Sequence, residues 1–214
     1  PMDDSLDDQK ETKKESLEIE VKFYVREAEV LQRQIVATGA VGRGRFFETN
    51  HCFDDDSGRL TQSASLLRLR QDDRTRLTFK APPGQTDPRF KVCREDEVVI
   101  SDFDAMTRIL EGLGFRRRQV YEKWRETFVL EGTLLCIDTL PFGSFIEIEG
   151  TGEAIIRMAA QLGFDWQQRI IKNYLAIFDH VKRRFNLPFD DVTFRNFESV
   201  CIDIEPLLRQ MTAG

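Results

Sequence analysis

Residues 17–25 read LEIEVKFYV, and apolar and polar side chains alternate strictly along this stretch. One face carries five apolar side chains, and the other carries Glu18, Glu20, Lys22 and Tyr24. A period of two residues is typical of a β-strand with two different faces. This stretch therefore predicts a strand whose polar face holds charges of both signs.

Four later stretches divide in the same way: LLRLRQ (66–71), TRLTFKA (75–81), YEKWRETF (121–128) and SFIEIEG (144–150). Their polar faces carry, in that order, Arg68 and Arg70; Arg76, Thr78 and Lys80; Lys123 and Arg125; and Glu147 and Glu149. An antiparallel sheet with one core face and one solvated face accounts for any single strand of this kind. Here some faces are purely basic and others purely acidic, which favours a shared polar interior.

The remaining patterns place helices between and after these strands. Helical spacing covers about 27–38, 101–115, 153–164 and 171–185, and Ser101 or Asp102 is the expected N-cap of the second helix. HCFDDDSGRL (51–60) predicts a short strand followed by a turn. If about six antiparallel strands turn their apolar faces toward the helices, the sheet closes around its charged faces. We therefore predict an α+β fold, a closed antiparallel β-barrel with a charged interior and helices packed outside.

The composition divides the chain into three parts. Residues 1–15 are nearly all polar or charged and predict a flexible leader. Residues 16–185 carry the barrel pattern and form the expected main domain. Residues 186–214 mix Pro, Asp and short apolar runs, and we expect a C-terminal extension whose role the sequence does not define.

Charge and cysteine content exclude several classes of partner and compartment. The 214 residues carry a net charge of −6, which argues against a nucleic acid duplex or an anionic membrane as the main partner. No apolar run reaches the roughly 20 residues of a membrane-spanning helix. The four cysteines are scattered without a CxxC pair, as is typical of reduced thiols. We expect a cytoplasmic protein.

Clusters of like charge inside a barrel require counter-ions. Arg and Lys side chains suit phosphate oxygens, and carboxylates suit Mg²⁺ or Mn²⁺, which also bind phosphates. A chain of phosphates with divalent cations would satisfy the basic and the acidic clusters together.

The order of these residues resembles the CYTH, or triphosphate tunnel metalloenzyme, superfamily. Residues 18–22 (EIEVK) match its ExExK signature. LRLR, TFK, REDE, EKWR, Asp138, EIE and KNY follow in the family's order, over about residues 17–180. PFGSFIEIEG (141–150) is similar to the branch named class IV adenylyl cyclase. The resemblance implies a β-tunnel, a triphosphate-bearing small molecule as substrate, Mg²⁺ or Mn²⁺ as cofactor, and a possible homodimer.

The resemblance also implies a role for each matching residue. As metal ligands it implies Glu18, Glu20, Glu147 and Glu149, with Asp138, Glu95 and Glu97 as candidates for a second cation. As phosphate contacts it implies Lys22, Arg68, Arg70, Lys80, Lys123, Arg125 and Lys172, the last from the C-terminal helix. Glu20, Glu149 and Lys22 are the expected catalytic residues. In a regular strand Glu95 and Glu97 point to one face and Arg94 points to the other. All of the REDE motif (94–97) can therefore line the tunnel only if a β-bulge changes the direction of some of its side chains.

Three functions remain open at this stage. The first is divalent-metal-dependent hydrolysis of a triphosphate, either inorganic tripolyphosphate or an organic triphosphate. The second is an adenylyl cyclase that converts ATP to cyclic AMP and pyrophosphate. The third is a non-catalytic polyphosphate- or nucleotide-binding module, against which the presence of both ExE pairs counts.

A few other polar residues suggest weaker sites. His51 and His180 stand alone and predict packing or surface roles. Residues 54–58 (DDDSG) predict a solvated turn, and residues 116–118 (RRR) a tunnel rim or a solvated run after a helix. Tyr174 is expected to pack, with a polar tip that can reach the substrate.

Overall fold

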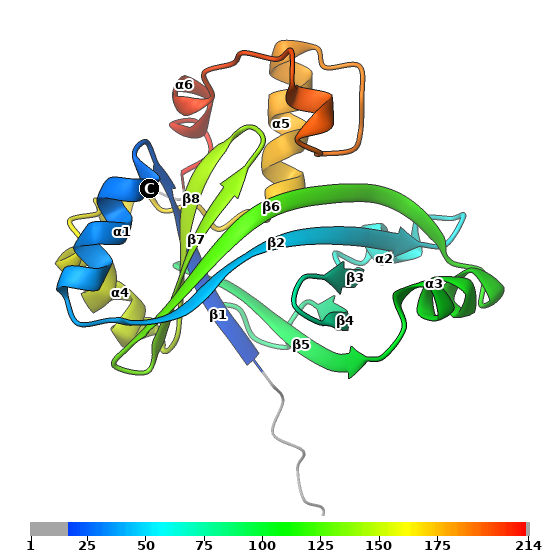
Figure 1. Ribbon diagram of the computed structural model, residues 1–214, viewed down its shortest axis with the longest axis horizontal. Coiled ribbons are helices and arrows are strands. Elements are labelled where there is room, and N and C mark those ends of the chain that lie inside the picture. Colours follow the sequence, from blue (N-terminus) through cyan, green and yellow to red (C-terminus); the bar gives the residue numbers. More distant parts are fainter. Residues whose placement is uncertain (1–16, 213–214) are drawn as a thin grey trace, which may run out of the picture.

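The computed structural model describes residues 17–212, so the expected leader at 1–15 lies outside the described residues. The strands are β1 (Leu17–Val25), β2 (Val41–Asp54), β3 (Leu66–Gln71), β4 (Thr75–Ala81), β5 (Lys91–Ile100), β6 (Arg116–Leu130), β7 (Thr133–Leu140) and β8 (Gly143–Glu149). The α-helices are α1 (Ala28–Ala37), α2 (Arg59–Gln62), α3 (Phe103–Gly112), α4 (Gly152–Gln161), α5 (Tyr174–Phe185) and α6 (Glu205–Leu208). Two 3₁₀ turns, η1 (Trp166–Gln168) and η2 (Arg195–Phe197), complete the chain (Figure 1).

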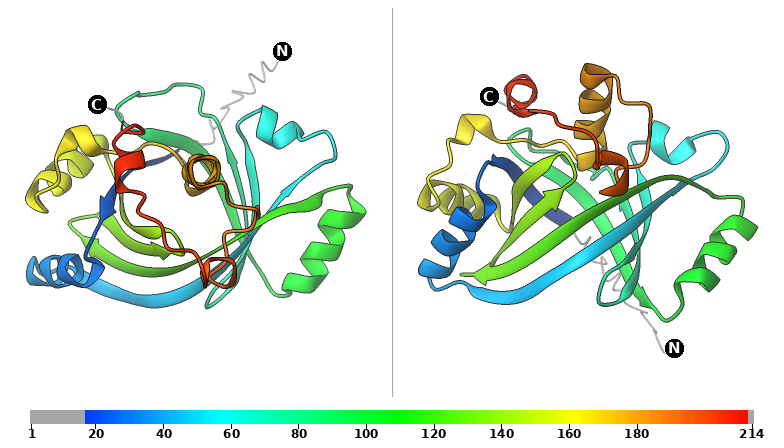
Figure 2. Two further views of the ribbon diagram at one scale, coloured as in Figure 1. Left: turned by 90° about the horizontal axis from the view of Figure 1, so that it is seen from above. Right: turned by 45° about the horizontal axis from the view of Figure 1, so that its top comes forward.

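The eight strands form a closed barrel in the order β1-β5-β4-β3-β2-β6-β7-β8. Every neighbouring pair is antiparallel, and β1 closes the ring because it pairs with β5 through 17–20 and with β8 through 20–25. Seen from above, the strands surround a central space, which we call the tunnel (Figure 2). The predicted fold class is confirmed.

Helices cover the apolar outer face of the barrel at two places. On one side, α1 and α4 place Ile35 and Ile155 against Val21 of β1 and Ile148 of β8, all fully buried. On the other side, α3 places Leu110 against Leu67 and Leu69 of β3. The outward residues of β1 and β3 are therefore core residues, and strand alternation turns their polar neighbours into the tunnel.

The C-terminal part of the chain closes one end of the tunnel. Residues 174–211, which we call the cap, run from α5 across the barrel end to α6 (Figures 1 and 2). Tyr174 and Phe178 of α5 join Phe145 of β8 in one buried cluster, together with Phe197 and Leu208 from the extension. The extension also pairs with the barrel, because the backbone N–H groups of Val192 and Glu122 donate to the carbonyls of Val120 and Val192 at 2.8 and 2.9 Å.

Several local predictions are confirmed by their capping geometry. Asp102 caps α3 by accepting from the N–H of Ala105 at 2.8 Å. The β6–β7 hairpin turns at Glu131 and Gly132, both with positive φ. Asp54 accepts N–H bonds from Leu60 and Thr61, so that residues 54–58 form the expected turn before α2.

Two expectations about the elements were wrong. The strand predicted only near residue 51 is the 14-residue β2, which begins at Val41. The last long helix begins at Tyr174 with Asn173 as N-cap, so Lys172 lies before it. Residues 116–118 are, as expected, an exposed run after a helix, because they follow α3 and also begin β6. No helix in the described part of the chain is long and apolar enough to cross a membrane.

Candidate functional site

The charged strand faces converge on two adjoining cavities inside the barrel. An inner cavity of about 60 Å³ lies beside Tyr174 of the cap, and an outer cavity of about 410 Å³ lies beside Leu17, at the start of β1. Both are lined by Glu18, Arg68, Arg70, Lys80 and Arg125, and they therefore adjoin along these five side chains. The inner part adds Glu20, Lys22, Lys91, Lys123 and Glu147, and the outer part adds Glu95, Glu97 and Glu149.

Carboxylates from β1 and β8 form one wall of the tunnel. The register places Glu20 opposite Glu149 and Lys22 opposite Glu147. Lys22 lies 3.1 Å from Glu147 and also contacts Glu20, while Lys91 donates to Glu20 at 2.7 Å. No ion pair to Glu149 occurs within residues 17–212, although its neighbours on this wall are all paired.

The environment of Glu149 changes its proton affinity. Burial, followed by the charges of Glu18, Glu20 and Glu147, raises the pKa of Glu149 to about 7. Burial acts on Glu147 in the same direction, but Arg125 and Lys22 outweigh it and hold the pKa of Glu147 well below its ordinary value. Adjacent carboxylates on one strand face thus differ in charge state near neutral pH.

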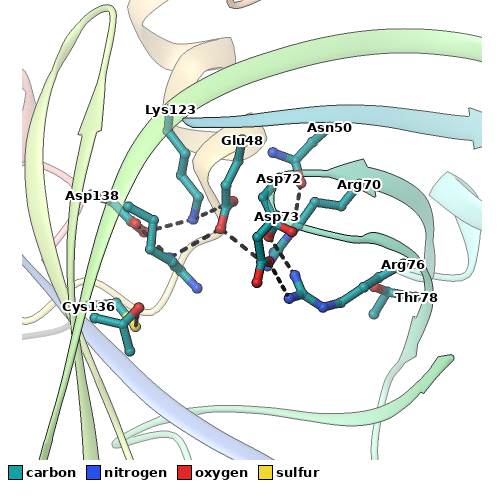
Figure 3. A network of polar contacts seen from close by, with 12 residues as sticks. Glu48, Asn50, Arg70, Asp72, Asp73, Arg76, Thr78, Lys123, Cys136 and Asp138 are labelled. Carbon is teal, nitrogen blue, oxygen red and sulfur yellow. Dashed lines mark hydrogen bonds and ion pairs between the residues drawn. The ribbon is translucent and has the colours of Figure 1, made fainter. Parts of the chain in front are cut away.

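Asp138 organises the neighbouring wall, which is formed by β6 and β7. It is fully buried and accepts bonds from Lys123 at 2.8 Å (Figure 3). It also accepts bonds from Arg125 at 2.7 and 2.5 Å, and from the hydroxyl of Tyr174 at 2.8 Å. Its carboxylate therefore has four donors from three side chains. This arrangement fixes the positions of Lys123 and Arg125, which were predicted as phosphate contacts.

Glu48 of β2 is the second buried anchor. It lies 3.3 Å from Arg70, 3.6 Å from Lys123 and 3.8 Å from Arg125. Burial would raise the pKa of Glu48, but Lys123, Arg125 and Arg70 together lower it to about 2. Arg70 also donates to Asn50 at 3.1 Å, so that β2 holds the guanidinium from two positions (Figure 3).

The wall formed by β3, β4 and β5 mixes both signs. Arg68 donates to the hydroxyl of Tyr121 at 3.1 Å and to Thr78 at 3.2 Å. Lys80 contacts both Glu18 and Glu95 across the tunnel wall. Ligand atoms of Glu18, Cys93 and Glu95 lie within 4.8 Å of one another, which forms a compact group of metal-ligating type.

The family model of the CYTH domain matches residues 16–160, which is more than half of the 214-residue chain. The chain belongs to the CYTH domain family. A comparison with functionally curated proteins finds no match.

Solved structures show the same fold at low sequence identity. A candidate adenylate cyclase from Vibrio parahaemolyticus is 21% identical with a TM-score of 0.68, and the match covers 76% of this chain and 98% of the other. The protein PH1012 from Pyrococcus horikoshii is 25% identical with a TM-score of 0.63, covering 73% and 96%. A candidate adenylyl cyclase from Hippeastrum, with a dominant triphosphatase activity, is 18% identical with a TM-score of 0.55, covering 76% and 94%.

The donor set of this CYTH protein fits a hard divalent cation. Glu20 and Glu149 are direct cross-strand neighbours, and like charges in that position are destabilising unless a cation offsets them. Glu149 has no ion-pair partner among the described residues, and the oxygen ligands available beside it suit Mg²⁺ or Mn²⁺. The CYTH family is generally dependent on divalent metal, and a buried acidic cluster is present here.

The structure brings most of the predicted site residues of the CYTH chain into the tunnel. Glu18, Glu20, Glu95, Glu97, Glu147 and Glu149 line it, as do Lys22, Arg68, Arg70, Lys80, Lys123 and Arg125. Asp138 lies behind the lining, saturated by its donors. Arg94 faces away and pairs with Asp96 at 3.8 Å, so the strand needs no bulge.

Lys172 is the exception among these residues. It is exposed, it precedes α5, and it lines neither tunnel cavity, although its neighbours Asn173 and Tyr174 line the inner one. His51 also lies outside the tunnel, where its ring packs edge-on against Phe103 at 4.9 Å.

Sequence reasoning missed Glu48, Asn50, Lys91 and Tyr121. The signal for the first two was the alternation of Glu48, Asn50, Cys52 and Asp54 along residues 47–54 (FETNHCFD), which is strand periodicity. Lys91 shares the face of Cys93 and Glu95 in the same way.

Proposed function

We propose that this CYTH protein hydrolyses a triphosphate bound in the tunnel, with a divalent cation held by the β1 and β8 carboxylates. The observation that carries the proposal is that clusters of basic and of acidic side chains line the same tunnel. Arg68 and Arg70 come from β3, and Lys123 and Arg125 come from β6 on the other side of β2, whereas Glu18, Glu20, Glu147 and Glu149 come from the adjacent strands β1 and β8.

The basic side chains suit a phosphate chain because they are already fixed. Asp138 holds Arg125 through two hydrogen bonds, and Glu48 and Asn50 hold Arg70. A guanidinium in a fixed orientation gives up little conformational entropy when it donates to phosphate oxygens. Such side chains would also stabilise the charge that develops on the phosphate oxygens during transfer.

Glu20, Glu147 and Glu149, together with Glu18, are the residues that would hold the cation, for which we propose Mg²⁺ or Mn²⁺. When bound, the cation would supply charge neutralisation for the phosphates and acidity for the attacking water. Glu149 is the candidate proton acceptor, because it is the carboxylate of this wall that has no ion-pair partner among the described residues. Lys22, which contacts Glu20 and Glu147, would move toward the phosphates as the cation replaces it.

The second candidate is an adenylyl cyclase, in which the ribose 3′-hydroxyl replaces water as nucleophile. The specific observation in its favour is the similarity in fold to candidate adenylate cyclases, including the one from Vibrio parahaemolyticus. At 21% identity this similarity concerns the fold alone. Both reactions use the same tunnel and the same cation.

A product assay separates the two reactions. Purified protein is incubated with Mg²⁺ or Mn²⁺ and either tripolyphosphate or ATP, and phosphate, pyrophosphate and cyclic AMP are quantified, with EDTA as the metal-free control. Phosphate from tripolyphosphate without cyclic AMP from ATP supports the triphosphatase. Cyclic AMP and pyrophosphate from ATP instead establish the cyclase. Polyphosphate binding without any product returns the protein to the non-catalytic binding class.

A further inference from the structure

Lys91 of β5 is a tunnel lysine whose ion pairing differs from that of the other tunnel lysines. The register places it directly opposite Glu20 of β1, and its ammonium group donates to Oε1 of Glu20 at 2.7 Å. Glu20 is its one ion-pair partner among the described residues. Lys22, Lys80 and Lys123 each contact two carboxylates instead. Lys91 therefore serves a single carboxylate, and it is one that we expect to hold the cation.

Two ammonium groups meet at the same oxygen atom of Glu20. Lys22 and Lys91 both donate to Oε1, and the side chain of Glu20 is only 3% exposed, so little water screens the charges there. Like charges at so short a separation repel each other. Together the two lysines bring two positive charges to one carboxylate, which is the charge that a divalent cation carries. In the substrate-free protein the lysine pair thus stands in for the cation at Glu20.

The other cross-strand neighbour of Glu20 lacks a counter-ion. Glu149 of β8 faces Glu20 and has no ion-pair partner among the described residues. A divalent cation between these two carboxylates would satisfy both, but it would lie beside the ammonium group of Lys91. At equal distance a divalent cation repels an ammonium group twice as strongly as a second ammonium group does. The inner cavity gives Lys91 another partner, because Arg68 and Arg125, which are expected to contact phosphate, line the same cavity.

We propose that Lys91 is an exchangeable counter-ion: it neutralises Glu20 in the substrate-free protein, opposes the binding of a divalent cation alone, and turns to the phosphates when the triphosphate enters. The inference rests on the proposed function, because it requires a cation at the β1 and β8 carboxylates. Cation and triphosphate then bind with positive coupling, since each ligand removes a charge that disfavours the other. The substrate-free protein should bind the free metal ion weakly.

The first test is a titration of the substrate-free, full-length protein with Mn²⁺, in which the electron paramagnetic resonance signal of the free ion measures binding. Lys91→Met removes the positive charge and keeps most of the side-chain length. It should bind Mn²⁺ at least about tenfold more tightly than the wild type. Lys91→Arg keeps the charge and should bind as the wild type does. Lys182→Met is the matched control, because Lys182 is an ion-paired lysine of α5 that lines neither tunnel cavity.

The second test is a calorimetric titration of the same proteins with tripolyphosphate in EDTA. Lys91→Met should bind tripolyphosphate about two- to tenfold more weakly than the wild type, because one hydrogen-bond donor to the phosphates is lost. A damaged tunnel would bind Mn²⁺ and tripolyphosphate more weakly alike. Opposite changes in the two affinities therefore distinguish an exchangeable counter-ion from a merely structural residue.

Equal Mn²⁺ affinity of Lys91→Met and the wild type would overturn the inference, as would an equal gain in affinity by Lys91→Arg. Unchanged binding of tripolyphosphate by Lys91→Met would show that Lys91 does not turn to the phosphates, which also overturns it. Absence of Mn²⁺ binding in the wild type and in every variant would overturn the proposed function as well. Thermal unfolding identifies a misfolded variant, and Lys91→Gln, which keeps a hydrogen-bond donor for Glu20, then decides the question.

Discussion

Glu20 of β1 and Glu149 of β8 are direct cross-strand partners on the tunnel-facing side of the barrel. Lys91 neutralises Glu20 from the other neighbouring strand, but no cation pairs with Glu149 among the described residues. Glu20 pairs with both Lys22 and Lys91, whereas the facing carboxylate of Glu149 has no counter-ion of its own, and this arrangement is unfavourable for the protein alone. The same two carboxylates become a favourable arrangement when a divalent cation lies between them.

Glu149→Gln should abolish metal-dependent turnover without loss of stability. Removal of even an indirect partner of a metal typically costs 10–100-fold, so we expect a decrease of at least about a hundredfold for a direct ligand. Because the substitution removes one of two facing charges, the free energy of unfolding should stay equal or rise. Phosphate release and urea unfolding test this, with Glu111→Gln, an exposed carboxyl on α3, as control. A fully active Glu149→Gln protein would contradict the assignment.

The metal-free protein should lose stability as the pH rises through the pKa of Glu149. This pKa is raised from 4.5 to about 7 in the folded state, so the folded protein holds the proton more tightly than the unfolded chain. The protonated form of Glu149 therefore contributes roughly 1–3 kcal/mol to the free energy of unfolding. This contribution is fully present below about pH 4.5 and is lost as the pH approaches and passes 7.

Urea unfolding in EDTA between about pH 5 and about pH 7.5 measures this loss. His51 changes the stability in the opposite direction. Burial lowers the pKa of His51, so its contribution to the free energy of unfolding grows as the pH rises. The difference in pH dependence between the wild type and Glu149→Gln gives the contribution of Glu149 to the free energy of unfolding. Identical pH dependence of the two proteins would show that Glu149 does not titrate in this range.

Asp138→Ala should destabilise the protein, in contrast to Glu149→Gln. Asp138 is the acceptor for Lys123, Arg125 and Tyr174, and its removal leaves buried cations without their partner. Breaking a buried ion pair by removal of one member costs about 3–5 kcal/mol. Tyr174→Phe removes a single hydrogen bond and should cost about 1 kcal/mol. Chemical denaturation of both variants tests the order, and a stable Asp138→Ala protein would show that Asp138 is no anchor.

The extension should contribute to stability through its apolar side chains. Leu208 is 3% exposed within the cap cluster, and Leu208→Ala should cost about 2–5 kcal/mol. The ion pair between Arg26 and Glu205 fastens the same helix at 2.5 Å, but its partners are solvated, so Arg26→Ala should change the melting temperature little. If the two variants melt alike, the cap is only loosely attached.

The fold was predictable from sequence because alternation along single strands carries most of it. LEIEVKFYV and LLRLRQ show both faces without interruption, and they are the strands whose apolar faces meet helices. The first half of β2 was not predictable, since Gly42, Gly44 and a register shift between them interrupt the period. The cap was not predictable either, because its short apolar runs pack against residues at the end of the barrel, and that surface exists only once the barrel has formed.

The site was predictable as a set of residue types but not as a network. Strand parity placed Arg68, Arg70 and Arg125 on polar faces, but no sequence pattern shows that Asp138 and Glu48 would hold them. Asp138 was expected as a candidate metal ligand, and the structure surrounds it with cations instead. Such long-range pairing depends on which strands close the barrel, which is a property of the tertiary fold.

The most direct test of the central claim is calorimetric titration of tripolyphosphate into the wild type and into Arg70→Ala, with a divalent cation present. Arg70 lines both cavities, and charge-assisted hydrogen bonds of its type contribute about 1.5–3 kcal/mol. We predict one binding site per chain and at least about tenfold weaker binding by Arg70→Ala. No binding by the folded wild type, or equal affinity of the two proteins, would contradict a triphosphate site in the tunnel.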